Sequence, residues 1–109
     1  MSLSVRRSVV NDRHVLSAEG SLDLATLPRF GDALARLVSD TVGSVCVVDL
    51  DGAGTVDDAA LGLLLGAAGR SRNDGGDLAV VCTDARLCRR LADTGFDRAV
   101  RVVSSISAA

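Results

Sequence analysis

The stretch Val45-Cys46-Val47-Val48-Asp49-Leu50-Asp51-Gly52-Ala53-Gly54-Thr55-Val56-Asp57-Asp58-Ala59-Ala60-Leu61-Gly62-Leu63-Leu64-Leu65 decides the fold of this chain. Its first six residues are apolar except for Asp49, which predicts a strand buried on both faces. Gly52 and Gly54 then favour a tight loop. The apolar residues that follow are spaced to share one helix face, namely Ala59, Leu61, Leu64, Leu65 and Ala68. The stretch therefore predicts a strand, a loop and a helix, with two carboxylates, Asp57 and Asp58, at the helix N-terminus.

The length and composition favour one domain with an aliphatic core. The chain has 109 residues, too few for two domains of ordinary size, so we expect a single domain over residues 1–109. Hydrophobic residues make up 48% of the chain and aromatic residues only 2%. Because the net charge is -2 and the arginines are scattered, we expect no direct contact with nucleic acid. All twelve basic residues are arginine, which excludes every mechanism that needs a lysine.

The cysteines and the apolar runs indicate where the protein works. Three cysteines, an odd number without metal-type spacing, favour a reducing compartment. The N-terminus lacks the apolar core of a signal peptide. The longest apolar run, residues 59–68, is about half of what a membrane span needs. We therefore expect a cytoplasmic protein with no membrane segment, no metal and no cofactor.

The flanking sequence supplies further strands and helices. Two β-type runs, residues 3–10 and 13–18, join through Asn11-Asp12 as a hairpin. A loop over residues 20–25 leads to a helix with Thr26 as its N-cap and Pro28 in its first turn. A buried strand at residues 78–82, a helix after Asp84 and a strand at residues 99–103 follow, and then a frayed or weakly helical tail. The order ββαβαβαβ predicts an α/β fold, a mixed and mostly parallel sheet with an antiparallel N-terminal hairpin and helices packed on it.

The adjacent carboxylates of Asp57 and Asp58 are the first candidate site. Helix capping explains one of them, at about 1 kcal/mol, and two neighbouring carboxylates repel each other. A divalent metal, with Asp49 or Asp51 as further ligands, is a weaker interpretation because neighbouring residues rarely aim enough ligands at one point. Dinucleotide binding is rejected, because a carboxylate at the helix start would repel a pyrophosphate.

Two smaller features have ordinary structural explanations. The helix glycines Gly62, Gly66 and Gly69 cost helix propensity, so we expect a close backbone approach to the sheet or to a partner there. Cys82 at a strand end and Cys88 on the next helix could approach each other. We favour two small buried hydrophobic side chains over a redox pair at these positions.

Four segments resemble one protein family, the STAS domain of bacterial anti-sigma factor antagonists. Gly20–Thr26 (GSLDLAT) resembles the family's G-x-L-D-x-x-T, and Val48–Gly52 (VDLDG) resembles V-D-L-S-G. Val56–Gly62 (VDDAALG) falls on I-D-S-S-G-L-G, and Thr94–Arg98 (TGFDR) resembles T-G-L-D-R. The order of the four segments makes the resemblance specific, and it covers nearly the whole chain.

The resemblance implies a regulator that is not an enzyme. In the family, an anti-sigma factor that is also a serine kinase phosphorylates the first Ser of that pattern, and the unphosphorylated protein binds this kinase and frees the sigma factor. The matching position here is Asp58, followed by Ala59 and Ala60, so the phosphoacceptor is absent. Asp58 imitates part of the charge of a phosphoserine and little of its shape.

Three outcomes of this replacement are open. The protein is held in a phosphorylated-like state, it binds a partner that accepts Asp58, or its control has moved to Cys82 and Cys88. We expect a monomer or weak dimer whose partner is an anti-sigma factor of the serine kinase type. The alternative is an accessory subunit of a transporter or signalling complex. The expected contact residues are Asp23, Thr26, Asp57, Asp58, Ala59, Ala60, Leu61 and Gly62.

Overall fold

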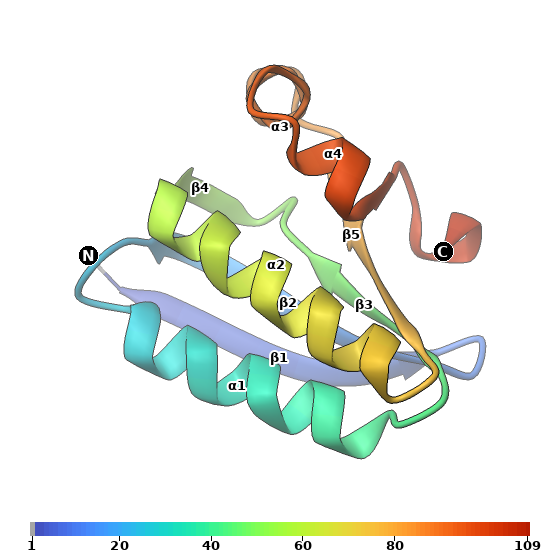
Figure 1. Cartoon of the computed structure of the whole chain (residues 1–109). Helices are drawn as coiled ribbons and strands as arrows, with labels where there is room; N and C mark the ends of the chain where they lie inside the picture. Colours follow the sequence, from blue (N-terminus) through green and yellow to red (C-terminus); the bar gives the residue numbers. More distant parts are fainter. Residues whose placement is uncertain (1) are drawn as a thin grey trace.

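A six-stranded sheet with helices on one face organises the structure, a computed structural model that describes residues 2–109 (Figure 1). Strands β1 and β2 pair antiparallel, and all other pairings are parallel. The predicted fold class is therefore confirmed. The elements in chain order are β1 (Leu3–Val10), β2 (Arg13–Leu22), α1 (Leu27–Asp40), β3 (Val45–Asp49), β4 (Ala53–Val56), α2 (Asp58–Asn73), β5 (Asp77–Val81), α3 (Ala85–Asp93), α4 (Phe96–Ala99), β6 (Arg101–Val103) and the 3₁₀ turn η1 (Ile106–Ala108).

The long strand β2 supports two strands in series. The sheet order is β1-β2-β3-β5-β6, and β4 pairs with the far end of β2 beyond β3. We predicted a strand ending at residue 18 and a loop from residue 20, but β2 continues to Leu22. The part of β2 that extends beyond β3 has an unpaired edge. Strand β4 forms on this edge, where we predicted only a loop. A Cβ at Gly52 would lie 2.7 Å from Glu19 Cγ, so the chain passes β2 too closely there for a larger residue.

Helices α1 and α2 cover one face of the sheet (Figure 1). Thr26 is the N-cap residue of α1 and Pro28 lies in its first turn, as predicted. The buried face of α2 differs from the predicted one: Leu61, Leu64 and Ala68 are buried, but Ala59 and Leu65 are exposed. Apolar residues occur on every side of this helix, so their spacing alone could not define the face. The small residues Ala60, Ala67, Ala68 and Ser71 complete the buried side.

The second face of the sheet carries a smaller core. Val15, Val47 and Val81 are buried there, with Ile106 and Ala109 of the tail packed against them. Arg101 Nη2 donates a hydrogen bond of 2.9 Å to Ala108 O and fixes the tail over this face. The tail that we predicted as frayed or weakly helical therefore includes a docked 3₁₀ turn. Within residues 2–109, no helix is long and apolar enough to cross a membrane.

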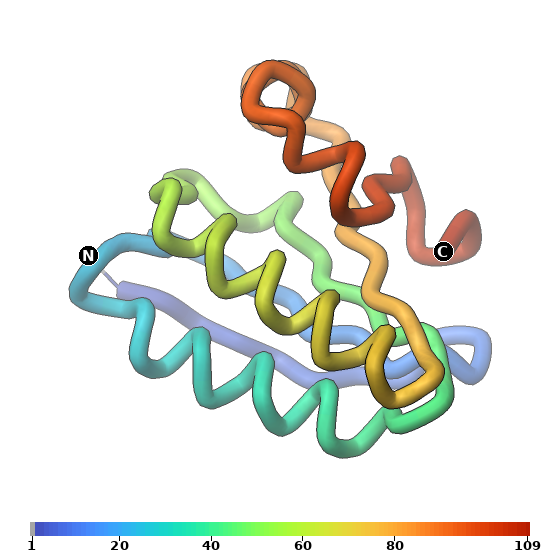
Figure 2. Tube along the Cα trace, in the orientation of Figure 1, coloured from blue at the N-terminus to red at the C-terminus, as the bar shows by residue number. Residues whose placement is uncertain are grey.

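The connection after β5 contains two helices where we predicted one. The predicted N-cap Asp84 accepts a hydrogen bond of 2.9 Å from Leu87 N through its side chain. Gly95 adopts φ +78° after α3, as expected for a left-handed position. The short helix α4 then begins at Phe96, whose buried ring ties it to the core. Figure 2 shows α3 and α4 beside the starts of β4 and α2 rather than over the middle of the sheet.

Candidate partner-binding surface

Three chain segments lie along the end of the sheet where the parallel strands finish (Figure 2). They are the loop between β2 and α1, the junction between β4 and α2, and helix α3. Asp57 N donates a hydrogen bond of 2.9 Å to Leu22 O, which fixes the β4–α2 junction to the end of β2. The start of α2 is thus held on the sheet, and the side chains that precede and follow it have defined directions.

Asp57 is the N-cap residue of α2, but it does not act as a side-chain cap. Its backbone is extended, and its carbonyl accepts from Ala60 N at 2.9 Å and from Leu61 N at 3.3 Å. Among the described residues, its carboxylate makes no capping hydrogen bond. The capping that we predicted to explain one of the two carboxylates is therefore wrong for Asp57, whose side chain remains exposed.

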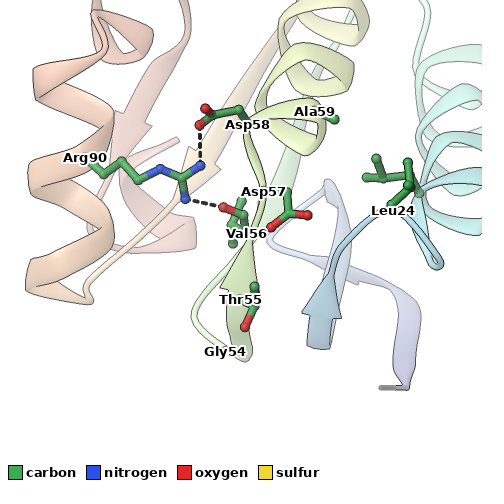
Figure 3. A pocket seen from close by; sticks show the side chains of 9 residues that line it. Leu24, Gly54, Thr55, Val56, Asp57, Asp58, Ala59 and Arg90 are labelled. Carbon is green, nitrogen blue, oxygen red and sulfur yellow. Dashed lines mark hydrogen bonds and ion pairs between the residues drawn. The ribbon is translucent and has the colours of Figure 1, made fainter.

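Asp58 is paired with an arginine from another helix. Its carboxylate lies 2.5 Å from Arg90 Nη2, and Arg90 Nη1 donates to Val56 O (Figure 3). The Asp58 side chain is nevertheless 87% exposed. Figure 3 shows Asp58 turned toward Arg90 and Asp57 turned away from it. The two carboxylates thus point in different directions, which reduces their repulsion, and Asp58 is paired with the positive charge of Arg90.

The other carboxylates near this end have separate partners. Asp51 Oδ1 accepts hydrogen bonds from Thr83 N at 2.7 Å and from Thr83 Oγ1 at 3.0 Å, and Asp49 Oδ1 accepts from Asp51 N at 2.9 Å. Within residues 2–109, three or more His, Cys, Asp or Glu side chains nowhere gather closely enough to hold a metal ion. The carboxylates at this end therefore form hydrogen bonds that fix the loops, and one of them forms an ion pair.

Two depressions border Asp58. The first, here the Leu24 depression, is lined by Leu24, Leu27, Gly54 to Ala59 and Arg90 (Figure 3). The second, here the Leu65 groove, is lined by Asp58, Leu61, Gly62, Leu65, Thr94, Gly95, Phe96 and Ala99. Leu24 is 82% exposed and Leu65 is 41% exposed, so each depression is lined by a large apolar side chain that is exposed to solvent. Apolar side chains beside a fixed charge are typical of protein contact surfaces.

The exposed side of α2 contains the glycines that we expected to approach the sheet. A Cβ at Gly62 or Gly69 would meet no heavy atom of residues 2–109 within 4 Å, and one at Gly66 would meet only the end of the Arg70 side chain at 3.4 Å. The expected close approach to the sheet is therefore wrong. The approach of a partner remains a prediction, and Gly62 lies in the Leu65 groove where a partner could use it.

The expected contact residues separate into exposed and buried groups. Asp57, Asp58, Ala59 and Gly62 are exposed, and Asp23 is half-buried. Thr26 and Ala60 are buried, and Leu61 is 5% exposed. The Thr26 hydroxyl donates to Ser21 O at 2.7 Å and accepts from Asp23 N at 3.0 Å, so it holds the β2–α1 loop. Thr26 and Ala60 therefore support the predicted contact surface from below, whereas Leu61 also borders the Leu65 groove.

Three residues of this surface were missed from the sequence. Arg90 lies next to the buried positions Leu87 and Leu91 of α3, which places it at the edge of the buried face, but no pattern shows its partner. Leu24 lies in a segment that was predicted as a loop and matched to a family motif, and neither observation indicates an exposed apolar contact. Leu65 was assigned to the core because its spacing placed it on the predicted buried helix face.

Cys82 and Cys88 approach each other at the edge of the same region. Their Sγ atoms lie 3.1 Å apart, and both are free thiols. Cys82 is buried and Cys88 is half-buried. Burial, and then the neighbouring Cys88 thiol, raise the pKa of Cys82 to about 12. Cys46 lies apart from the pair in the core, where burial also raises its pKa.

Comparison with known proteins identifies the family. No curated protein sequence matches the chain. The chain is similar in fold to an anti-sigma factor antagonist from Mycobacterium paratuberculosis, with a TM-score of 0.86 and 20% identity over 98% of this chain and 90% of that chain. It is also similar to an anti-sigma factor antagonist (STAS) domain protein from Planctomyces limnophilus, with a TM-score of 0.80 and 14% identity over 95% and 92% of the two chains.

A third similar structure is the Bacillus anti-sigma factor antagonist SpoIIAA in its unphosphorylated form, with a TM-score of 0.69 and 12% identity over 98% and 92% of the two chains. At these identities the structures establish the fold alone. The sequence gives the stronger result, because the family model of the STAS domain matches residues 6–109. The chain therefore belongs to the STAS domain family.

Proposed function

We propose that this protein is a regulator of the anti-sigma factor antagonist type. It binds an anti-sigma factor of the serine kinase type, and Asp58 replaces the phosphoacceptor serine, so that control by phosphorylation is lost. One observation carries the proposal: Asp58 is exposed at the start of α2, between two depressions that present Leu24 and Leu65 to solvent. A charged group with apolar neighbours on both sides supports binding by surface contact rather than catalysis.

The ion pair between Asp58 and Arg90 supports the loss of phosphorylation control. A lone carboxylate buried against a partner costs several kcal/mol, since the partner must replace its hydration. Here Arg90 already supplies a positive charge and holds the carboxylate in one direction. We therefore propose that the partner recognises the Asp58–Arg90 pair as a unit, rather than Asp58 as an imitation of phosphoserine.

The chemistry of the neighbouring side chains agrees with this proposal. Residues 56 to 60 are Val, Asp, Asp, Ala and Ala, so this segment offers a kinase no hydroxyl. A kinase that reaches the start of α2 can bind there but cannot transfer a phosphoryl group to it. The resulting complex is one that ATP alone does not reverse.

The test is titration calorimetry of the chain against the anti-sigma factor encoded nearest to its gene, followed by mass spectrometry after incubation with ATP. Wild type should bind and gain no phosphate within residues 53–62, Thr55 included, and Asp58→Ser should gain one phosphate at position 58. Arg90→Gln should weaken binding of the wild-type surface, whereas the matched change Arg89→Gln, at an exposed arginine of the same helix outside both depressions, should leave it unchanged.

Two results would contradict the proposal. Phosphorylation of the wild-type chain at the start of α2 would show that control has been retained. Absence of binding by both wild type and Asp58→Ser would exclude the anti-sigma factor as partner, and recovery of the chain with a membrane complex would then favour the accessory subunit.

A further inference from the structure

The end of β5 and the start of α3 bring two thiols into contact. Cys82 directly follows β5, and Cys88 lies in the first half of α3. The sulfurs are 3.1 Å apart, and Cys88 Sγ also lies 3.4 Å from Cys82 O. We propose that Cys82 and Cys88 form a reversible disulfide, which makes this turn a site of thiol modification. The sequence favoured plain packing for the pair, and the observed contact is what changes the interpretation.

The geometry requires little movement. A disulfide has a sulfur–sulfur distance of about 2.05 Å, so the sulfurs must approach by about 1 Å. Rotation of two side chains and a small shift of the first turn of α3 can supply this distance. The third cysteine offers an internal control, because Cys46 is buried in β3 and its thiol faces Asp77 O at 3.6 Å.

The exposure of the two thiols sets the order of the chemistry. Cys88 is half-buried and Cys82 is 4% exposed, so an external disulfide of low molecular weight, R–S–S–R, meets Cys88 first. The Cys88 thiolate attacks one sulfur and releases one R–S⁻. The Cys82 sulfur then attacks the Cys88 sulfur of the mixed disulfide and releases the second R–S⁻. The two protein thiols lose two electrons and two protons, and the external disulfide is reduced to two R–SH.

The second of these steps should depend on the pH. Burial raises the pKa of Cys82, so only a small fraction of this sulfur is a thiolate near neutral pH. Part of the shift is caused by the Cys88 thiol, and this part disappears once Cys88 has entered the mixed disulfide. Closure should therefore accelerate as the pH rises.

The disulfide lies close to the Asp58–Arg90 pair. Arg90 is two residues beyond Cys88 on α3, and its guanidinium bonds both Asp58 and Val56 O. Movement of Cys88 toward Cys82 displaces the turn that carries Arg90. Oxidation should therefore change the surroundings of the Arg90 side chain, while the Arg72–Asp77 ion pair at the opposite end of β5 remains as it is.

The decisive experiment treats the folded chain with oxidised glutathione and stops thiol exchange with acid. The remaining thiols are then alkylated in denaturant near neutral pH before mass spectrometry and peptide mapping. Wild type should retain one alkylated thiol, Cys46, and show a peptide link between Cys82 and Cys88; reduced glutathione should restore all three thiols. Cys46→Ser should still form the link, and Cys88→Ser should not. Three alkylated thiols in folded, treated wild type, or a mixed disulfide that persists at Cys88, would overturn the proposal.

The effect on Arg90 has its own measurement. In NMR spectra of the oxidised and reduced chain, the Nε–Hε resonance of Arg90 should shift and that of Arg72 should not. An unchanged Arg90 resonance in a chain that carries the disulfide would refute the coupling to α3. Neither measurement uses a binding partner, so both results stand apart from the test of the proposed function.

Discussion

Replacement of Leu64 by alanine tests which face of α2 meets the sheet. Leu64 is 0% exposed and lies in the main core cluster beneath α1 and α2. The change removes three carbon atoms, which accounts for about 2.4 kcal/mol at ~0.8 kcal/mol each. The cavity that remains adds to this loss, so we expect Leu64→Ala to lower the free energy of unfolding by about 3–4 kcal/mol.

The neighbouring leucine provides the matched control. Leu65 is 41% exposed and is not part of the core clusters of the described residues. The same change there removes the same atoms from the same helix, but much of the side chain already meets water, so Leu65→Ala should cost about 1 kcal/mol or less. Helix propensity contributes almost equally to both changes.

Urea unfolding followed by circular dichroism measures both variants. With a slope of ~1.5 kcal/mol/M, Leu64→Ala should lower the midpoint by about 2 M without changing the slope. If the two variants lose equal stability, or if Leu65→Ala loses more, the assigned helix face is wrong.

Three further predictions follow from individual contacts. A double-mutant cycle of Asp58→Asn and Arg90→Gln should give a coupling of at most about 1 kcal/mol that disappears at high salt, because the pair is exposed, and a larger coupling would indicate a buried pair. The folded-state pKa of Cys82 lies above its ordinary value of 9.0, so the folded chain keeps its proton longer than the unfolded chain and stability should fall as the pH rises from 9.0 toward about 12. Because burial also raises the pKa of Cys46, Cys82→Ala should reduce this slope without abolishing it in melting curves recorded across that range. Gly76→Ala should destabilise the fold strongly, since the added Cβ would collide with Ser44 O. Gly62→Ala should instead stabilise the reduced chain by about 0.5–1 kcal/mol, because the added Cβ there points into open space. Equal melting temperatures for the two variants would contradict the packing described here.

Local patterns predicted the sequence-adjacent parts of the fold. The apolar run at residues 45–50, the Asn11-Asp12 turn and the cap at Asp84 all act on near neighbours, so their effects could be read from the sequence. Strand β4 could not be read in this way. Its four residues become a strand only because β2 extends beyond β3, and that length is a property of a distant segment.

The same distinction applies to the candidate site, where features of one element could be predicted and contacts between elements could not. Asp57 and Asp58 were predicted at the helix start because they precede an apolar helix, and the structure places them there. Arg90 reaches Asp58 from 32 residues away in the chain, through the packing of α3 against the end of the sheet. Sequence spacing describes one element at a time, so an ion pair between two elements could not be predicted from it.

The attachment of α2 to β2 has a consequence for the motions of the site. The amide of Asp57 is held by Leu22 O, at the end of a strand that also pairs with β1, β3 and β4. This amide can exchange its hydrogen with solvent only when the β4–α2 junction separates from the end of β2, which breaks a contact between two elements. A partner that docks at Asp58 thus meets a surface that is already ordered, and its association rate is set by diffusion and orientation rather than by waiting for the start of α2 to form.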